Sequence, residues 1–534
     1  MYKAPARTGW FFAAWDPRFD IQKIPMLRSN IIANFLGKVW PSLLGILLVP
    51  VYLYYLGVEA YGLIGFFVSL QALISFLDLG LSTATNREVA IGLNSREKEE
   101  QTRDLVRTLE VVYGFIALLI ALVFFFGSDW LATEWINVSE LSVEMVRFAA
   151  IIFGISLALR WPVALYSGIL QGSERQVLYN GLYVAIYTAR GVGAAIVVAL
   201  VSRNILAFLL WQLVTALLEL LVMALAAWRT LQPGSSRAPR VDFSSLRHVW
   251  KFSASVGANS LLAALIKQMD RILISKLLLL QQVGYYTTAN TVYSAVSLVT
   301  SPFASAAFPR FTALIAEKKY SDLADTYHKI SQYVSFVVAP ICAVLFFFSY
   351  DILLLWTRSE EVAVNAAPTL SILAVAALFN SMMQLPFMLQ LAAGITWISL
   401  WNNFINLIVL APIMYFLISR YGVAGAGISW ALFNLLYFLV VPHVMHRHVL
   451  PNEKVSWFLK DTLFLIFLGT LPFVVIHMVG YKSLAMLFFE IMLSGIFYLV
   501  IVLLFYPAIR MAVKDLILSN PITRILSRRR NVLG

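Results

Sequence analysis

The strongest constraint on the fold is a series of long apolar segments that recurs along almost the whole chain. A helix needs roughly 20 mostly apolar residues to cross a bilayer, and the sequence holds fourteen such segments. They are Asn30–Leu56, Tyr61–Leu81, Leu105–Gly127, Met145–Leu170, Val177–Val201, Ile205–Trp228, Trp250–Leu280, Gly284–Phe303, Tyr327–Trp356, Ala366–Leu391, Ile398–Ile418, Val423–Val444, Val455–Met478 and Leu484–Tyr506. The sequence therefore predicts an all-α polytopic membrane protein of about 14 transmembrane helices.

The composition agrees with a fold that is solvated by lipid. The 534 residues are 60% hydrophobic and 13% charged, with a mean hydropathy of +0.80, whereas a soluble protein is roughly 25% charged. The one cysteine, Cys342, lies inside an apolar segment, so no disulfide framework is predicted. We expect no metal site and no cofactor. The net charge of +12 is spread over short loops, which is typical of a membrane protein and does not indicate nucleic-acid binding.

The distribution of Lys and Arg predicts the orientation in the membrane. The loops on one side of the fourteen segments, together with both terminal segments, hold most of the basic residues, including Arg528–Arg530. The loops on the other side hold Arg203, Lys276, Arg358, Arg420 and Lys482. Because basic loops remain in the cytoplasm, both termini are predicted to be cytoplasmic.

The longest gap between the segments predicts the division of the chain. Arg229–Val249 contains Pro233, Gly234 and Pro239, which is typical of a linker. The predicted parts are a cytoplasmic or interfacial N-terminal segment (1–29), a first lobe of helices one to six (30–228), a cytoplasmic linker (229–249), a second lobe of helices seven to twelve (250–447), two further helices (455–506) and a basic cytoplasmic tail (507–534).

An internal repeat relates the two lobes. The aligned pairs are Val58 with Val283, Tyr61 with Tyr286 and Ser69 with Ser294 at a shift of 225 residues, and Trp211 with Trp430 at a shift of 219. Such repeats are a mark of transporters. Six helices is an even number, so the two lobes have parallel topology. We therefore predict two pseudo-symmetric lobes that face a central cavity, with the last two helices outside the repeat.

Polar and ionisable residues inside the apolar segments are the candidate functional residues, because a charge at membrane depth costs at least ~2.5–3.5 kcal/mol. The candidate substrate-binding cations are Lys38, Arg160, Arg190, Lys267 and Arg271. The candidate ion-coupling acids are Asp78, Glu219 and Asp270, and the candidate polar stripe of the cavity consists of Asn30, Asn34 and Asn259.

The cations outnumber the acids among these candidates. Mutual neutralisation is one interpretation, in which Asp270 pairs with Lys267 or Arg271 and Glu219 pairs with Arg190. Even then at least two cations are predicted to lack an acidic partner. Since Arg binds phosphate through two parallel hydrogen bonds, the sequence predicts an anionic substrate that carries phosphate or diphosphate.

One stretch resembles a known family. The run LGVEAYGLIGFFVSLQALISFLDLGLSTATNREVA at Leu56–Ala90 holds an LG-x-x-x-YG turn, a D-L-G-L end at Asp78–Leu81 and the pair Asn86-Arg87, and the second half is similar at Asp270-Arg271 and Val283–Ala289. These motifs resemble the polysaccharide transporter family, the O-antigen and capsule flippases of the multidrug/oligosaccharidyl-lipid/polysaccharide exporter superfamily. Related lipid II flippases carry basic residues on helix eight, whereas Gly284–Phe303 has none, which favours the polysaccharide branch.

The resemblance implies a function. Members of this family flip undecaprenyl-diphosphate-linked oligosaccharides from the inner to the outer leaflet of the bacterial cytoplasmic (inner) membrane, by alternating access, for the biosynthesis of cell-surface polysaccharides such as O-antigen lipopolysaccharide and exopolysaccharide. A cationic cavity would hold the diphosphate and sugars, and the lipid tail would stay in the bilayer. The implied partners are this lipid-linked oligosaccharide, membrane lipid, and a polysaccharide polymerase and chain-length regulator.

Two other functions stay open at this point. A cation-coupled multidrug antiporter of the same superfamily needs cavity acids, and Glu219 and Asp270 are available, although the first helix has Lys38 and no acid. A membrane glycosyltransferase or O-antigen ligase needs a large outer loop with catalytic residues, and the longest one, Ser128–Glu144, has no His. We therefore predict a transporter and not an enzyme.

Overall fold

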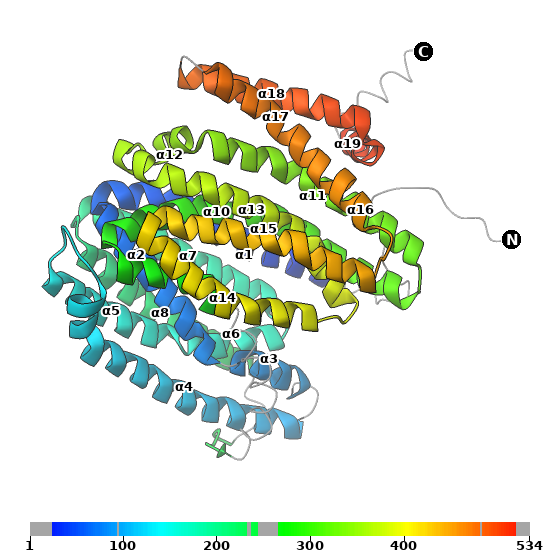
Figure 1. The fold of residues 1–534 in the computed structure, drawn as a ribbon. Coiled ribbons are helices and arrows are strands. Elements are labelled where there is room, and N and C mark those ends of the chain that lie inside the picture. Colours follow the sequence, from blue (N-terminus) through cyan, green and yellow to red (C-terminus); the bar gives the residue numbers. More distant parts are fainter. Residues whose placement is uncertain are drawn as a thin grey trace, which may run out of the picture.

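The computed structural model describes residues 24–78, 80–92, 96–231, 237–243, 265–480 and 483–519. Twelve helices among these residues are long and apolar enough to cross a membrane, and α2 is a shorter apolar helix. The chain is therefore a multi-pass helical membrane protein (Figure 1). Residues 250–264 of the seventh predicted segment, Trp250–Leu280, lie outside the described residues, so the count of about 14 stays a prediction.

The helices follow the predicted segments with a few divisions. The first lobe consists of α1 (Ile24–Leu56), α2 (Val58–Ile74), η2 (Ser75–Asp78), α3 (Leu81–Gly92), α4 (Arg96–Trp130), η3 (Leu131–Trp135), α5 (Val143–Arg160), α6 (Val163–Gly172), α7 (Gln176–Leu200) and α8 (Ile205–Thr230). The second lobe consists of a helix at 265–277, α10 (Leu280–Ala316), α11 (Tyr320–Phe347), α12 (Ser349–Thr357), α13 (Glu360–Ala392), α14 (Trp397–Tyr421) and α15 (Val423–His448). The C-terminal elements are α16 (Lys454–Ser456), η5 (Trp457–Leu463), α17 (Phe464–Val479), α18 (Leu484–Phe505) and α19 (Pro507–Ser519).

Several predicted boundaries differ from the structure, including the break between α5 and α6 inside the predicted segment Met145–Leu170. The segment Tyr61–Leu81 was expected as one span, but it breaks at η2, so that α2 and α3 are separate helices. The segment Tyr327–Trp356 divides at Phe348 between α11 and α12. The first part of the predicted tail, Pro507–Ser519, is helical. Apolar composition marks the membrane-embedded residues, but it does not mark short breaks between helices that remain embedded.

Short polar side chains begin several helices at one end of the bundle. The N-cap side chains that accept a backbone hydrogen bond belong to Ser142 before α5, Asn204 before α8, Ser359 before α13 and Ser483 before α18. Such caps satisfy N–H groups that have no partner inside the helix. We call the end of the bundle at which these four helices begin the far end. The basic end is the opposite one, where α10 meets α11 at Lys318 and Lys319.

Helix packing produces two lobes and an added pair of helices. In the first lobe α1 packs on α7, and α5 packs on α4 and α8. In the second lobe α13 packs on α10, α11 and α15. Helix α17 packs on α11 and α18, and in Figure 1 α18 and α4 lie at opposite edges of the bundle.

The two lobes meet closely where α2 crosses α10. A Cβ added to Gly62 would lie 2.3 Å from the carbonyl oxygen of Leu280, and one added to Gly284 would lie 2.3 Å from that of Val58. Each glycine therefore faces the carbonyl four residues before the other glycine, which is the reciprocity expected of two helices related by a two-fold axis. Small residues let membrane helices approach this closely.

The loop after α4 adds polar contacts between the lobes at the far end. The buried carboxylate of Glu59 accepts the backbone N–H groups of Glu140 (2.6 Å) and Leu141 (2.8 Å). The same loop crosses to the second lobe, where the backbone N–H of Leu280 donates to the carbonyl of Asn137 at 2.8 Å. Glu59 thus fixes a loop that bridges the two lobes.

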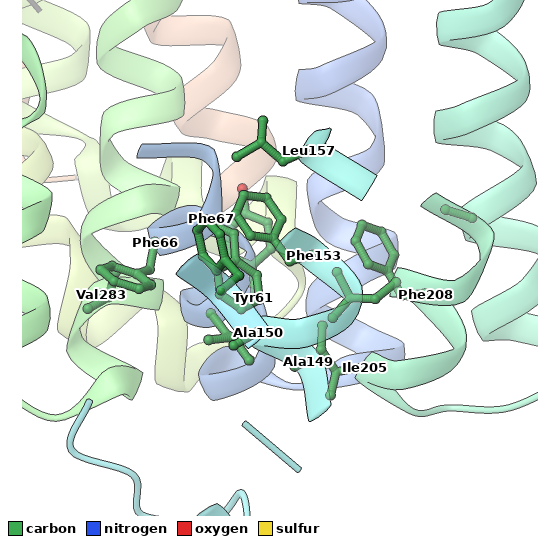
Figure 2. Close-up of a cluster of buried hydrophobic side chains, with 14 of the residues drawn as sticks. Tyr61, Phe66, Phe67, Ala149, Ala150, Phe153, Leu157, Ile205, Phe208 and Val283 are labelled. Carbon is green, nitrogen blue, oxygen red and sulfur yellow. The ribbon is translucent and has the colours of Figure 1, made fainter. Parts of the chain in front are cut away.

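The two largest clusters of buried apolar side chains are a core that both lobes share and a core that the second lobe forms with Trp457 of η5. The shared core contains Phe67, Phe153 and Phe208 of the first lobe with Val283 and Leu370 of the second (Figure 2). The rings of Phe67 and Phe153 stack with centroids 4.3 Å apart. A separate core lies at the basic end of the second lobe, and its buried members include Phe311, Leu323, Leu389 and Met445. Among the described residues, the lobes therefore share a core toward the far end.

Candidate functional site

The clearest charged cluster inside the bundle lies in the first lobe. Arg160 on α5 and Arg190 on α7 both approach the carboxylate of Glu219 on α8, with nitrogen–oxygen distances of 3.6 Å and 3.7 Å to the same oxygen, Oε2. The Glu219 residue is 7% exposed. All three residues are candidate site residues from the sequence, and the fold brings their side chains together.

A helix break places Arg160 at this position. Arg160 is the last residue of α5, and Trp161 and Pro162 separate it from α6. Proline lacks the N–H that would continue the helix, so α5 ends here within the apolar region. A cation in the last turn of a helix interacts favourably with the partial negative charge of that terminus. The break therefore provides a stable place for a guanidinium at membrane depth.

The two arginines are only partly satisfied by their protein partners. Arg160 donates to the side-chain oxygen of Gln212 at 2.9 Å, but its Nε and the Oε2 of Glu219 have no hydrogen-bond partner. The guanidinium of Arg190 lies over the ring of Tyr187, 4.6 Å from the centroid. Two positive charges on side chains that are 13% and 15% exposed thus share one negative charge, and the cluster carries a net charge of +1.

A cavity opens beside this cluster. It has a volume of about 420 Å³ and is lined by residues of α1, α2, α5, α7 and α8, Arg160 and Arg190 among them. The aromatic rings of Phe67 and Tyr187 and the amide of Gln71 are also part of its lining. Such a lining combines apolar surface with a few hydrogen-bonding groups and a net positive charge, which suits an anionic polar ligand.

A row of tyrosines on α7 leads to the cluster. Tyr179, Tyr183 and Tyr187 follow each other at intervals of four residues, with ring centroids 6.1 Å and 6.0 Å apart. Arg190 follows one turn later on the same helix. Residues four apart share one face of a helix, so the spacing was visible in the sequence, but aromatic residues are so common in this chain that the row was not singled out.

The predicted polar stripe on α1 contacts α7. Asn34 donates to the side-chain oxygen of Gln176 and accepts from the side-chain amide of Asn180 at 2.7 Å. Asn34 thus takes part in packing between two helices of the first lobe. The side chains of Asn30 and Lys38 lie outside the described part of the structure, as does the whole of Asn259.

The second lobe holds its buried acid differently. Asp270 is 4% exposed and accepts hydrogen bonds from the hydroxyl of Tyr286, the indole Nε1 of Trp430 (2.9 Å) and the backbone N–H of Arg271 (2.7 Å). No ion pair to Asp270 is found among the described residues. Lys267 is exposed on its helix. The carboxylate is therefore stabilised by neutral donors, and Lys267 and Arg271 do not line the first-lobe cavity.

Asp78, the third candidate acid, has a local structural role. Its carboxylate accepts from the hydroxyl of Ser82 at 2.7 Å, from the backbone N–H of Ser82 at 3.3 Å and from the hydroxyl of Tyr113. Ser82 lies in the first turn of α3, so Asp78 satisfies a free N–H of that helix and joins it to α4. The ion-coupling role of Asp78 stays a prediction.

The sequence and fold both match known membrane transport proteins. A family model described as "Polysaccharide biosynthesis protein" matches residues 55–359, which is more than half of the chain. The chain belongs to this family. A Shigella flexneri protein named for O-antigen transport is 20% identical over 419 residues, which cover 78% of this chain and 97% of that protein. The match over most of both chains confirms the resemblance seen in Leu56–Ala90.

Solved structures show which fold the family member adopts. The lipid II flippase MurJ in an inward closed conformation superposes with a TM-score of 0.69 at 13% identity, over 90% of this chain and 99% of that one. An inward-facing multidrug resistance transporter of the MATE family gives a TM-score of 0.63 at 15% identity, over 80% and 99% of the two chains. The chain therefore shares its fold with both of these proteins, and the named relatives are transporters and not enzymes.

Proposed function

We propose that this protein is a flippase that moves an undecaprenyl-diphosphate-linked oligosaccharide from the inner to the outer leaflet of a bacterial cytoplasmic membrane by alternating access. The observation that carries the proposal is the buried first-lobe cluster, in which Arg160 and Arg190 share the single charge of Glu219. The family and the fold supply the context of polysaccharide biosynthesis and lipid flipping.

The size and charge of the cavity support this substrate class. A volume of about 420 Å³ accommodates a diphosphate or a sugar but not a long polyprenyl chain, so the tail would remain in the bilayer. The net positive charge attracts an anionic group, and a guanidinium binds two phosphate oxygens in parallel. Because the surrounding protein lowers the effective dielectric constant, the attraction is stronger there than in bulk water.

The remaining parts of the proposal follow from the sequence. Both termini lie in the cytoplasm because the basic loops are on that side. The chain has two lobes (30–228 and 250–447), joined by a linker (229–249), with two further helices (455–506). A polysaccharide polymerase and a chain-length regulator that act on the same lipid-linked sugar are its proposed partners.

Removal of one arginine tests the proposal. The variants Arg160→Gln and Arg190→Gln each leave one guanidinium for Glu219, so the cluster becomes neutral while retaining an ion pair. We expect each to lower flipping of the lipid-linked oligosaccharide by about 10- to 100-fold, the equivalent of one charge-assisted contact of ~1.5–3 kcal/mol. The assay is translocation in proteoliposomes, measured as access of the sugar to an externally added, membrane-impermeant glycosidase.

The control variant is Arg420→Gln, which removes a positive charge from an exposed position at the end of α14. It should translocate at the wild-type rate. If Arg160→Gln and Arg190→Gln also translocate at that rate while folding normally, the first-lobe cluster does not bind the substrate and the proposal is wrong.

A cation-coupled multidrug antiporter is the second candidate, because transporters of that kind share the fold. A cationic drug would need a cavity with excess negative charge, whereas Glu219 is outnumbered by two arginines. Drug accumulation in cells that lack their own exporters separates the candidates. The flippase proposal expects no resistance upon expression of this protein.

A further inference from the structure

A second cavity lies at the basic end, far along the chain from the first-lobe cluster. It has a volume of about 850 Å³ and is formed by α11, by η5 and the start of α17, and by the junction of α18 and α19. The chain leaves the long apolar helix α18 at Tyr506 and continues as α19. A cavity at this junction lies where a membrane-spanning helix ends, which is the depth of lipid headgroups.

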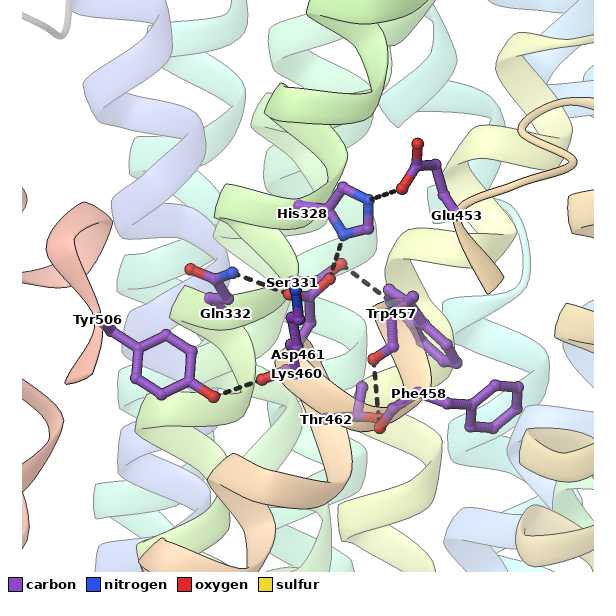
Figure 3. Close-up of polar contacts among 10 residues, drawn as sticks. All are labelled: His328, Ser331, Gln332, Glu453, Trp457, Phe458, Lys460, Asp461, Thr462 and Tyr506. Carbon is purple, nitrogen blue, oxygen red and sulfur yellow. Dashed lines mark hydrogen bonds and ion pairs between the residues drawn. The ribbon is translucent and has the colours of Figure 1, made fainter. Parts of the chain in front are cut away.

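Hydrogen bonds fix the inner wall of this cavity (Figure 3). His328 on α11 bonds the carboxylate of Asp461 through Nδ1 and that of Glu453 through Nε2, the latter at 2.9 Å. Gln332 donates to the other oxygen of Asp461 at 2.8 Å. The side chain of Asp461 is 1% exposed. Both acids are therefore occupied by His328 and Gln332, and the wall is a defined structure.

Further bonds hold η5 and the α18–α19 junction in place. The indole Nε1 of Trp457 donates to the hydroxyl of Ser331 at 3.1 Å, and the hydroxyl of Tyr506 donates to the carbonyl of Lys460. The element η5 is a π-helix, a rare form that is frequent at functional sites. Hydrogen bonds thus hold in place the three parts of the chain that form the walls of the cavity: α11, η5 and the α18–α19 junction.

The polar rim of the cavity carries both signs of charge. Lys329 and Asp325, one turn apart on α11, and Lys460 of η5 all line it and are exposed. Within the described residues none of these three side chains has an ion pair or a hydrogen bond. Two ammonium groups and one carboxylate are therefore available to a ligand, while the His328 cluster behind them is internally paired.

The other side of the cavity is apolar and open to lipid. Phe505 is 64% exposed and Phe464 is 42% exposed, and both belong to helices long and apolar enough to span the membrane. Helix α19 beyond them buries Ile509 and exposes Arg510, which is typical of a helix that lies along the membrane surface. A molecule that fills the cavity must match an apolar wall and a charged rim together.

We infer that this cavity binds a membrane phospholipid whose headgroup carries a phosphate and a primary amine, as in phosphatidylethanolamine. The phosphate lies between Lys329 and Lys460, the ammonium group faces Asp325, and an acyl chain covers Phe464 and Phe505. Basic pockets between membrane helices on the cytoplasmic side commonly hold lipid headgroups. The carboxylate at the rim distinguishes this site from one for a purely anionic lipid. The inference does not depend on the transported substrate.

Lipid binding to the purified full-length protein tests the site. Native mass spectrometry would be used with phosphatidylethanolamine, phosphatidylglycerol, phosphatidylcholine and undecaprenyl diphosphate added separately. We expect phosphatidylethanolamine to bind the wild type with the highest affinity, because phosphatidylglycerol has no ammonium group and the quaternary amine of phosphatidylcholine donates no hydrogen bond. The double variant K329Q/K460Q should bind it at least about tenfold more weakly, a loss of ~1.4 kcal/mol or more.

Two further variants complete the experiment. K318Q/K319Q removes the same charge from the exposed turn before α11 and should bind like the wild type. Asp325→Asn should retain binding but lose the preference for phosphatidylethanolamine over phosphatidylglycerol. The inference is wrong if K329Q/K460Q binds phosphatidylethanolamine as tightly as the wild type does. It is also wrong if the wild type prefers phosphatidylglycerol, or if it binds undecaprenyl diphosphate and none of the phospholipids.

Discussion

The two lobes hold their buried acids in opposite ways. In the first lobe, Glu219 lies between Arg160 and Arg190, and neither ion pair is closer than 3.6 Å. In the second lobe, Asp270 accepts three hydrogen bonds, all of them from neutral groups. Both carboxylates are less than a tenth exposed, so burial alone does not explain the difference.

The difference separates a carboxylate with an oxygen that accepts no hydrogen bond from one whose two oxygens both accept hydrogen bonds. The first-lobe cluster leaves polar atoms of Arg160 and Glu219 without hydrogen bonds, and an anion would supply them. Two of the donors to Asp270, Tyr286 of α10 and Trp430 of α15, hold the helix at 265–277 against those two helices, and the third is the backbone N–H of Arg271 on the same helix. The two lobes thus contain one acid that two cations share and one acid that neutral donors hold.

The largest effect is expected from removing the acid of the first lobe. Glu219→Gln leaves two buried guanidinium groups facing each other without a carboxylate. Breaking a buried pair in this way typically costs ~3–5 kcal/mol. We expect a large fall in the thermal unfolding temperature of the purified protein, measured by intrinsic tryptophan fluorescence.

A second substitution shows whether the lost stability of Glu219→Gln comes from repulsion between the two arginines or from lost packing. The double variant Arg190→Gln with Glu219→Gln removes one guanidinium and restores part of the stability, but it should not restore translocation. If Glu219→Gln is as stable as the wild type, the two arginines do not depend on that carboxylate, and the contrast between the lobes fails.

A smaller effect is expected in the second lobe. Asp270→Asn keeps an oxygen that accepts from Tyr286 or Trp430 but adds two N–H donors where acceptors were needed. An unsatisfied buried polar group costs ~1–3 kcal/mol, so the unfolding temperature should fall less than in Glu219→Gln. Translocation should stay within about threefold of the wild type. A complete loss of translocation in a stable Asp270→Asn protein would instead make Asp270 part of an ion-coupling site.

The smallest effects concern a pair of tryptophans that the repeat aligns. The indole of Trp430 donates to the carboxylate of Asp270, whereas that of Trp211 donates to the backbone carbonyl of Ala189 at 3.1 Å. Hydrogen bonds to charged groups contribute ~1.5–3 kcal/mol and neutral ones ~0.5–1.5 kcal/mol. Trp430→Phe should therefore destabilise the protein more than Trp211→Phe in the same unfolding measurement. The reverse order would show that Asp270 does not need the indole.

The sequence predicted the fold class and part of the site. Helical spans follow from apolar length, and the family follows from the motifs in Leu56–Ala90, because both are local properties of the chain. The meeting of Arg160, Arg190 and Glu219 depends on helix rotation, which apolar helices of similar composition do not specify. For the same reason the sequence did not predict that Asn34 packs on α7, or that Asp270 accepts from an indole and a phenol and does not pair with Lys267.

The sequence also did not predict where helices break inside the apolar segments. Helix α5 ends at Arg160 because Pro162 follows it, yet Pro302 and Pro309 lie inside the continuous helix α10. A proline therefore permits a break without requiring one, since neighbouring helices can satisfy the freed carbonyl groups. Tertiary packing decides which prolines end a helix.

The reciprocal contact between Gly62 and Gly284 can form only after both α2 and α10 have been synthesised. The contact joins residues that are 222 positions apart, and a ribosome adds ~5–20 residues per second, so α2 waits about 10 to 45 seconds for α10 to be made. During that interval the glycine face of α2 lacks its contact with α10, and Val283 is missing from the shared core. The first half of the chain therefore completes its folding only after much of the second half has entered the membrane.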